Sequence, residues 1–287
     1  MKLNAYAKVN LGLDIVRKNE QGYHDLKSIF VPITLHDQIM IHPFREDQFR
    51  VYPKFFIHPE KNTILKMIDV CRKRFNFKEH FSITLHKHIP SQAGIGGGSA
   101  DAAAVLNYLI DFYGWDLSVQ EKIEIAKEVG ADVPFCVFNQ PALVEGIGDH
   151  LQFFDFKSTT HVVLVQAKKG VSTAKAFAGL DYPNLKHPNI DDLKEALIQE
   201  DYQGFTQHLG NSFEDVAIQL VPQIKAIKDQ LIECGCDATQ MSGSGSVVMG
   251  FSQDEAVIDK CVQYFRGKVR FVRKTSLMVK ASDNLLK

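Results

Sequence analysis

Four glycines stand within five positions of the chain, in the segment PSQAGIGGGSADAAA that begins at Pro90. They are Gly94, Gly96, Gly97 and Gly98, and an alanine-rich run follows them directly. Glycine lets the main chain adopt positive φ and approach a ligand without Cβ clashes. At the start of a helix, free N–H groups and the positive end of the helix dipole favour a phosphate. The segment therefore predicts a phosphate-binding loop, in preference to a turn that is only flexible or tightly packed.

The sequence of this segment does not match either of two familiar phosphate-binding motifs. A Walker A loop needs Gly-Lys followed by Ser or Thr, and no lysine follows these glycines. The dinucleotide fingerprint GxGxxG, begun at Gly94, would need its third glycine where Ser99 stands. The sequence therefore indicates a third kind of phosphate loop.

A strand and a helix must hold this loop in place. The segment FSITLHKHI (residues 81–89) alternates like a strand and ends at Pro90, and Gly114 predicts the end of a helix further on. Between them lies an apolar stripe at helical spacing, formed by Val105, Leu106, Leu109, Ile110 and Tyr113. The predicted order is strand, glycine loop, helix.

Other segments carry equally clear periodicities. In YAKVNLGLDIV the apolar Val9, Leu11, Leu13 and Ile15 alternate with the polar or small Lys8, Asn10, Gly12 and Asp14, which predicts a strand with one core face. Ser118 and Glu121 have capping-box spacing and predict a helix that ends near Gly130. Further on, Leu220, Ile224, Ile227 and Leu231 predict one helical stripe, and DATQMSGSGSVVMGF predicts a strand, a tight loop and a strand.

Composition narrows the class of protein. The 287 residues have 33 basic and 34 acidic side chains and a net charge of −1, which provides no broad positive field for nucleic acid or membrane surfaces. Small-molecule chemistry is therefore favoured. The five cysteines form no CxxC pair, and no apolar run is long enough for a signal peptide or a membrane span. We expect reduced thiols and a cytoplasmic protein, with the oligomeric state left open, a homodimer included.

Three segments resemble the motifs of the GHMP superfamily, named after galactokinase, homoserine kinase, mevalonate kinase and phosphomevalonate kinase. YAKVNLGLDI is similar to the first motif, the glycine loop to the second, and MSGSGSVVMGF, with Gly243 and Gly245, to the third. The segments AKVNLGLDIVRKNEQGYHDL, GADVPFCVF, ALVEGIGDHL and KGVSTAKAF resemble the group of 4-diphosphocytidyl-2-C-methylerythritol kinases. These motifs follow in the family's order over nearly the whole chain.

This resemblance implies an α+β, two-domain GHMP kinase fold, with a nucleotide-binding domain and a substrate domain that meet at a cleft. We place the boundary at residue 156, which gives domains 1–156 and 157–287. The implied reaction transfers the γ-phosphoryl group of ATP to the 2-hydroxyl of a cytidine-diphosphate-linked methylerythritol, in the non-mevalonate route to isoprenoids.

The resemblance also assigns the catalytic residues. Asp132 in GADVP matches the family's catalytic aspartate, which accepts the hydroxyl proton as general base. Taken alone, an Asp before Val-Pro is more often a helix cap or a turn former. Lys8 matches the family's lysine beside that aspartate, where a cation keeps the carboxylate ionised and stabilises an alkoxide. Asn10 is expected near the acceptor end of the substrate.

The cytosine of the substrate is expected to bind aromatic residues. Tyr23 and His24 in GYHDL match family residues that stack on the base and hydrogen-bond its edge, and Phe177 in STAKAF closes the other side. A lone Tyr or Phe is more often a core residue. The combination is what distinguishes this group from its relatives.

The nucleotide is expected to bind the two glycine segments. Gly94, Gly96, Gly97, Gly98 and Ser99 cradle the ATP phosphates, Gly243 and Gly245 support the opposite wall, and Lys87 and Asn62 match positions near the nucleotide. Ala100 stands where many members have a second serine, so we expect the loop to act mainly through backbone amides. Mg²⁺ is expected with ATP, but no carboxylate stands out as its ligand.

Two alternatives remain. A kinase of mevalonate, homoserine or a sugar would keep the glycine loop without a cytosine site. A noncatalytic RNA-binding module would use the basic segment KVRFVRKTSLMVK, although its alternation favours an ordinary amphipathic strand.

Overall fold

The structure is a computed structural model that describes residues 1–18, 20, 22, 24–54 and 61–279. The chain divides into two compact units, each made of several segments. Unit 1 comprises Met1–Lys8, Leu35–Pro90 and Gly96–Asn139, and unit 2 comprises Val9–Thr34, Ser91–Ile95 and Gln140–Lys287. Helices and strands occur in both, in agreement with the α+β prediction. The family boundary at residue 156 stays a prediction.

The described strands are β1 (Lys2–Lys18), β2 (His24–Phe44), β3 (Gln48–Tyr52), β4 (His80–His86), β5 (Ala142–Gly146), β6 (His150–Phe153), β7 (His161–Gln166), β8 (Gly210–Asn211), β9 (Ala238–Met241), β10 (Val247–Ser252) and β11 (Phe271–Ser276). The described helices are α1 (Thr63–Phe75), α2 (Gly97–Tyr113), α3 (Val119–Val129), α4 (Val133–Phe138), α5 (Thr173–Ala178), the 3-10 turn η2 (Tyr182–Asn184), α6 (Ile190–Ile198), α7 (Tyr202–His208), α8 (Glu214–Leu220), α9 (Gln223–Cys234) and α10 (Glu255–Phe265).

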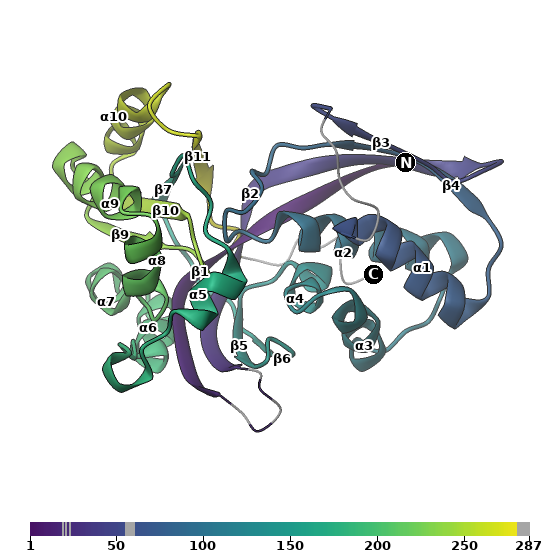
Figure 1. Cartoon of the computed structure of the whole chain (residues 1–287), viewed down its shortest axis with the longest axis horizontal. Helices are drawn as coiled ribbons and strands as arrows, with labels where there is room; N and C mark the ends of the chain where they lie inside the picture. The colour runs from purple at the N-terminus through teal and green to yellow at the C-terminus, as the bar shows by residue number, and fades with distance from the viewer. Residues whose placement is uncertain (19, 21, 23, 55–60, 280–287) are drawn as a thin grey trace. The chain divides into compact units, whose positions relative to one another are not determined.

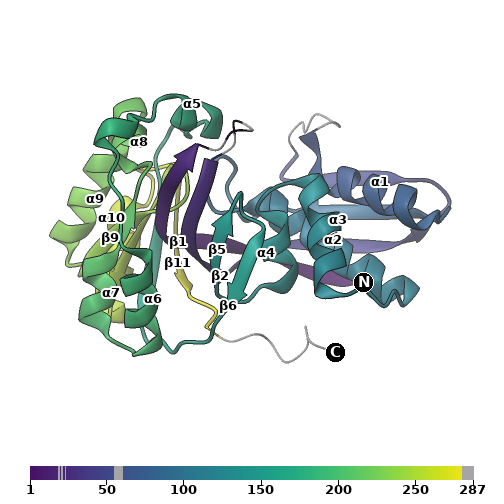
Figure 2. The same ribbon diagram turned by 90° about the horizontal axis from the view of Figure 1, so that it is seen from below.

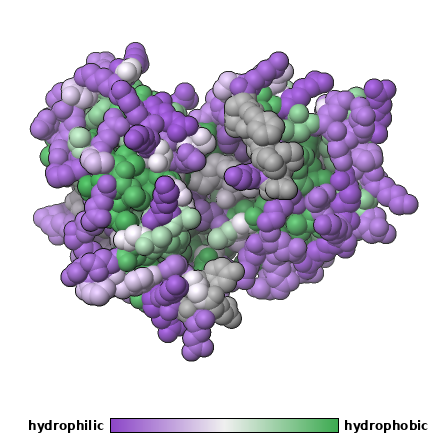
Figure 3. Space-filling view, in the orientation of Figure 1, coloured by the Kyte–Doolittle hydropathy of each residue, from purple (hydrophilic) through white to green (hydrophobic). Residues whose placement is uncertain are grey.

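Unit 1 is a sheet covered on one face by helices (Figure 1). Strand β4 pairs in parallel with β3 and antiparallel with the second half of β2. Every second residue of β4 is buried, namely Phe81, Ile83 and Leu85, because alternate side chains of a strand point to one face. Helices α1 to α3 lie against that face, and the surface over α1 and α3 is mainly hydrophilic (Figure 3).

Helix α2 carries the glycine loop at its start. Gly96 and Gly114 flank it with φ of 71° and 65°, in the left-handed region that glycine adopts at low cost. The predicted stripe is buried at Val105, Leu106, Leu109 and Ile110, so the expected helix and its stop at Gly114 are confirmed.

The next helix also begins and ends as predicted. Ser118 caps α3, and its side chain and that of Glu121 form the reciprocal hydrogen bonds of a capping box. Helix α3 ends at Val129, directly before Gly130. Local sequence rules are therefore sufficient for this element.

Unit 2 is built on an antiparallel sheet with strand order β11-β7-β10-β9. Helices α9 and α10 pack on it (Figure 2), and Val163, Val165, Ile227, Leu231 and Ile258 belong to the shared core. The first half of β2 pairs with β5, which pairs with β6, and β1 pairs in parallel with β8. The predicted strand, tight loop and strand of DATQMSGSGSVVMGF are β9 and β10, which pair with each other.

One predicted helix is wrong in its extent. Leu220 ends α8 and is 43% exposed, and the buried Ile224, Ile227 and Leu231 lie on the separate helix α9. Pro222 stands between them. Proline lacks an N–H group and disfavours the helical conformation of the preceding residue, so the chain breaks there although the apolar spacing continues.

Candidate functional site

Lys8 and Asp132 form an ion pair in unit 1. Lys8 comes from β1 and Asp132 directly precedes α4, and 3.3 Å separates Lys8 Nζ from Asp132 Oδ2. The lysine side chain is 4% exposed and the aspartate side chain 38%, so the carboxylate remains open to solvent. Asp132 makes no capping hydrogen bond with its side chain, although it holds the N-cap position of α4. Helix capping therefore does not account for this carboxylate.

The glycine loop adjoins the lysine of this pair. A Cβ on Gly96 would lie 3.0 Å from Lys8 Cγ, and its φ of 71° already favours glycine. A Cβ on Gly97 would lie 2.8 Å from Ile89 Cγ2 and 3.3 Å from Lys87 Nζ. A Cβ on Gly98, in contrast, would make only ordinary contacts with Thr63. Close approach therefore requires glycine at positions 96 and 97.

The first turn of α2 offers main-chain donors to a ligand. The first four N–H groups of an α-helix have no acceptor within the helix, and no side chain caps α2. Gly97, Gly98 and Ser99 are its first three residues. Because two of these residues are glycines, their own side chains do not cover the N–H groups, and such a terminus is suited to an anion.

Lys87 lies beside this turn in a cluster with two buried carboxylates. Its Nζ donates to Asp101 Oδ2 over 2.8 Å and also to Asp37 Oδ2. Asp37 Oδ1 accepts from the backbone N–H of Ile89 over 2.8 Å. Asp37 is fully buried and Asp101 is 3% exposed. Asp37 thus fixes both Lys87 and the backbone segment that leads to the glycine loop.

Burial and charge oppose each other in this cluster. Burial raises the pKa of Asp101 to about 7, against the attraction of Lys87. Burial alone would lower the pKa of Lys87, but the carboxylates of Asp101 and Asp37 reverse this effect and raise it. Asp101 Oδ1 is buried without a hydrogen-bond partner among the described residues. In this cluster Lys87 therefore stays protonated, and Asp101 is only partly ionised near neutral pH.

Sequence reasoning missed both aspartates. Asp101 could have been found because it is a charged residue within the alanine run of a buried helix face. Asp37 could have been found because it is an acidic residue at an inward position of a strand. Asn62 was predicted near the nucleotide. Its side chain caps α1 by accepting from the N–H groups of Ile64 and Leu65 at 3.1 and 3.3 Å, so its oxygen already has a structural task.

In unit 2 the residue that opens the loop, Gly94, lies against the second glycine segment. Ser242 Oγ donates to Gly94 O over 3.0 Å, and Val247 N donates to Ala93 O over 3.1 Å. A Cβ on Gly94 would lie 2.3 Å from Ser242 O, and its φ is 76°. The loop therefore begins on a surface that Ser242 and its neighbours provide.

Asn211 holds the second glycine segment itself. Its Nδ2 donates to Met241 O and to Gly243 O, each over 2.8 Å. The hydroxyls of Ser244 and Thr173 lie 2.8 Å apart and share a hydrogen bond. The predicted residues Gly243 and Gly245 therefore lie in a turn that is fixed from two sides, with Asn211 unforeseen by the sequence.

Asn10 is fully buried in the same unit. Its N–H donates to Ser242 Oγ over 3.2 Å and its Nδ2 donates to Ser28 Oγ over 3.0 Å. Ser28 Oγ in turn donates to Gly12 O over 2.5 Å. The orientation of the Asn10 amide is thus set by neutral hydrogen bonds.

His24 and Phe177 stack on each other, with ring centroids 4.3 Å apart and planes inclined by 20°. Phe177 also packs edge-on against Phe213, and Tyr182 lies nearly parallel to His24 at 6.2 Å. Burial, assisted by the charge of Lys18, lowers the pKa of His24, so the imidazole is neutral at pH 7. Its ring then has one donor and one acceptor nitrogen. Tyr23 lies outside the described residues.

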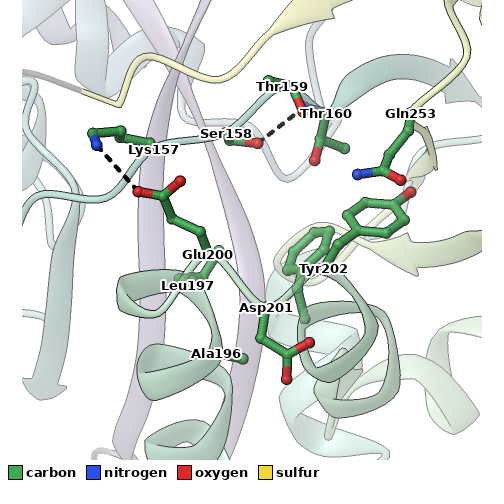
Figure 4. Close-up of a pocket in the computed structure, with 11 residues that line it drawn as sticks. Lys157, Ser158, Thr159, Thr160, Ala196, Leu197, Glu200, Asp201, Tyr202 and Gln253 are labelled. Carbon is green, nitrogen blue, oxygen red and sulfur yellow. Dashed lines mark hydrogen bonds and ion pairs between the residues drawn. The ribbon is translucent and has the colours of Figure 1, made fainter.

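A separate pocket of about 230 Å³ occurs in unit 2 (Figure 4). Lys157, Glu200, Asp201, Tyr202 and Gln253 contribute to its wall, and Lys157 Nζ lies 3.3 Å from Glu200 Oε1. None of its lining residues is one that the sequence predicted for the site. The described part of the chain has no group of three His, Cys, Asp or Glu side chains suited to a metal ion, and none of its helices could cross a membrane.

Comparison of the sequence with known proteins identifies one family. The family model for the N-terminal domain of GHMP kinases matches residues 62–140, and that for their C-terminal domain matches residues 193–269. The chain is 35% identical to the 4-diphosphocytidyl-2-C-methyl-D-erythritol kinase of Bacillus subtilis, with 92% of each chain covered. It is 33% identical to the Bacillus cereus protein of the same name, with 93% of this chain and 94% of that protein covered.

Solved structures agree with these relatives. A crystal structure of 4-(cytidine 5'-diphospho)-2C-methyl-D-erythritol kinase matches with a TM-score of 0.82 and 26% identity, covering 96% of this chain and 99% of that one. Homoserine kinase from Cytophaga hutchinsonii shares the fold, with a TM-score of 0.74, 16% identity, and coverage of 96% and 94%. Because the two family models together match more than half of the chain and the relatives extend over nearly all of it, the chain belongs to the GHMP kinases, in the group of the 4-diphosphocytidyl-2-C-methyl-D-erythritol kinases.

Proposed function

We propose that the chain transfers the γ-phosphoryl group of ATP to the 2-hydroxyl of 4-diphosphocytidyl-2-C-methyl-D-erythritol, a step of the non-mevalonate isoprenoid pathway. The observation that carries this proposal is the ion pair of Lys8 and Asp132, in a chain that belongs to this kinase group. Phosphoryl transfer requires mainly alignment and charge stabilisation, with help in removing the hydroxyl proton.

Asp132 is the general base in this proposal. Its carboxylate is held by a cation on one side and open on the other, which is what a proton acceptor for an incoming alcohol needs. The Lys8 side chain is only 4% exposed, so its charge acts in a medium of low dielectric constant. There the ammonium group stabilises the negative charge that develops on the hydroxyl oxygen.

The phosphates bind the main-chain donors at the start of α2. Gly96 to Ser99 supply N–H groups and the positive end of the helix dipole, and Lys87 adds a cation at Gly97. Gly94, Gly243 and Gly245 contribute through the turn that Asn211 and Ser242 hold. The role of Asn62 rests on its amide nitrogen, since its oxygen caps α1.

The cytosine binds His24 and Phe177, with Tyr23 as the third member. A neutral imidazole can donate to one atom of the base edge and accept from another, and an aromatic ring offers stacking area. Asn10 positions the end of the substrate that receives the phosphoryl group. The hydrogen bond from its Nδ2 to Ser28 orients the amide, and the bond from its backbone N–H to Ser242 fixes the main chain.

Mg²⁺ is the expected companion of ATP. It usually keeps several waters and binds through phosphates, so it needs few protein ligands. The described residues contain no carboxylate cluster that fits it. We therefore assign it no protein ligand and no step of the reaction.

A coupled ATP-consumption assay tests the proposal. The cytidylyl methylerythritol substrate should support turnover, and mevalonate and homoserine, run in parallel, should not. Free cytidine nucleotides should compete, because they carry the base that His24 and Phe177 recognise. Turnover with mevalonate or homoserine, unaffected by cytidine nucleotides, would assign another GHMP kinase activity. RNA retention that weakens steeply with salt, with no ATP turnover, would make the chain a binding module.

Two further properties belong to the proposal. We infer a cytoplasmic enzyme, because it acts on charged nucleotide metabolites. Sedimentation of the purified chain distinguishes a monomer from a homodimer, and limited proteolysis tests whether residues 1–156 and 157–287 separate as domains.

A further inference from the structure

Three buried cysteines gather in unit 2, away from any residue with a proposed catalytic role. Cys234 ends α9, Cys236 precedes β9, and Cys261 lies on α10. The sulfurs of Cys236 and Cys261 are 3.5 Å apart, in hydrogen-bond contact. Their exposed fractions are 4%, 5% and 0% in chain order. The turn between α9 and β9 and the helix α10 thus bring together thiols from separate segments.

The backbone around Cys236 is shaped for this contact. Gly235 reverses the chain after α9 with a φ of 111°, and Gly250 lies on the neighbouring strand β10. A Cβ on Gly250 would lie 2.8 Å from Cys236 Sγ, so only glycine leaves room for that sulfur. Cys236 is therefore directed toward Cys261 by the packing of the sheet.

The pair is chemically asymmetric. The hydrogen bond from Cys236 lowers the pKa of Cys261 to about 7, with a further contribution from Cys234 and against the effect of burial. The same hydrogen bond and burial raise the pKa of Cys236. Of the two thiols, Cys261 therefore ionises more readily than Cys236. In unit 1, burial raises the pKa of Cys71 to about 12, so that thiol is inert at neutral pH.

We propose that Cys236 and Cys261 form an oxidation site, at which a small hydroperoxide such as hydrogen peroxide converts the two thiols into a disulfide. The Cys261 thiolate attacks one peroxide oxygen, the O–O bond breaks, and a sulfenic acid and hydroxide result. The Cys236 sulfur then attacks the Cys261 sulfur, the S–O bond breaks, and water leaves with the Cys236 proton. The hydroxide takes up the proton that Cys261 released on ionisation. Overall, two thiols are oxidised by two electrons and one peroxide is reduced to two waters.

Because Cys236 and Cys261 are buried, peroxide needs a local opening of the structure to reach them. Helix ends and the turns that follow them open locally at low free energy, and Cys234 and Cys236 flank such a turn at Gly235. The disulfide would connect α10 to the start of β9, and β9 leads directly into Ser242 and the second glycine segment. It would close a loop of 25 residues and thereby restrict the unfolded chain.

The experiment uses the reduced full chain, treated with hydrogen peroxide, followed by alkylation and intact mass measurement. We expect a loss of about 2 Da for the disulfide, two fewer alkylated thiols, and full reversal by a dithiol reductant. Non-reducing peptide mapping should find Cys236 linked to Cys261. The melting temperature should rise by roughly 5 °C, as expected for closing a loop of this size in a chain of this length.

Matched serine variants locate the site. Cys236→Ser and Cys261→Ser should each abolish the mass loss, and Cys234→Ser and Cys71→Ser should keep it. The peptide map of the wild-type chain gives the linkage without any variant, should a variant fold poorly. Five alkylatable thiols after treatment, a link through Cys234, a link between two chains, or oxidation spread equally over all cysteines would each overturn the proposal.

Discussion

The two units bury polar groups in different ways. Unit 1 contains buried charges that are paired, Lys8 with the partly exposed Asp132 and Lys87 with two buried aspartates. Unit 2 buries neutral groups around its glycine turn and satisfies them with hydrogen bonds, as Asn10 and Asn211 show. A broken buried ion pair leaves an uncompensated charge and costs about 3–5 kcal/mol, whereas a lost neutral hydrogen bond costs about 1–3 kcal/mol. Unit 1 thus concentrates paired charges, and unit 2 fixes its glycine turn with neutral hydrogen bonds.

The largest effect should come from the open carboxylate of unit 1. Asp132→Asn should lower turnover by about two to four orders of magnitude while substrate affinity is kept, because the amide cannot accept the hydroxyl proton. Steady-state kinetics with the cytidylyl methylerythritol substrate measure both quantities. The exposed Asp116→Asn in the same unit is the control. Near-normal turnover in Asp132→Asn would remove this residue from its role.

The next largest effect should be on ATP binding at the start of α2. Gly97→Val should abolish ATP binding measured by calorimetry, because its side chain would enter the space of Ile89 and Lys87. Gly98→Ala is the matched control, since its Cβ makes only ordinary contacts with Thr63. Its affinity should stay within about threefold of wild type, given that helix propensity favours alanine. An equal loss of ATP affinity in both variants would show that the tight space around Gly97 does not matter for binding.

Stability measurements compare the two units directly. Lys87→Met leaves Asp37 and Asp101 buried without their cation and should cost about 3–5 kcal/mol in the free energy of unfolding. Ser242→Ala in unit 2 removes hydrogen bonds to Asn10 and Gly94 and should cost about 1–3 kcal/mol. Urea unfolding followed by circular dichroism gives both values. A larger cost for Ser242→Ala would reverse the contrast between the units.

Asp101 should make the stability of unit 1 depend on pH. Its folded pKa of about 7 exceeds the ordinary 3.8, so between these values the folded chain binds more protons than the unfolded chain. Stability therefore falls as pH rises through this window and levels off above it. Relative to Asp101→Asn, the wild type should lose on the order of 1–3 kcal/mol between pH 5 and pH 8. Parallel stability curves for the two proteins would exclude this titration.

The smallest effect should come from His24 in unit 2. Its lowered pKa keeps the imidazole neutral from pH 9 to pH 7, so binding of a cytidine nucleotide should be constant there. Protonation removes the one acceptor nitrogen, and because the pKa is lowered this should weaken binding only at a pH below the ordinary value of about 6.5. His24→Gln should bind more weakly and show no such dependence. A wild-type affinity that changes between pH 7 and pH 9 would point to another group.

Local patterns were sufficient for many elements but not for the groups around the site. The capping box at Ser118 and the glycine stop at Gly114 act within one turn of the chain, so the sequence predicts them. The break at Pro222 could have been predicted from the same rules, but the apolar spacing concealed it. The role of Asp37 could not have been predicted in this way, because its partners Lys87 and Ile89 are about 50 residues away in the sequence.

The sequence by itself determined the glycine loop at Gly94 to Gly98, the alternating strand with Lys8 and the order of the family motifs, since these depend on neighbouring residues. Only the tertiary structure decided that Lys87 lies between two buried aspartates and that Cys236 meets Cys261. The energies of charges and thiols depend on which groups face them across the fold and how much water remains. Neither the facing groups nor the remaining water can be read from a residue's neighbours along the chain.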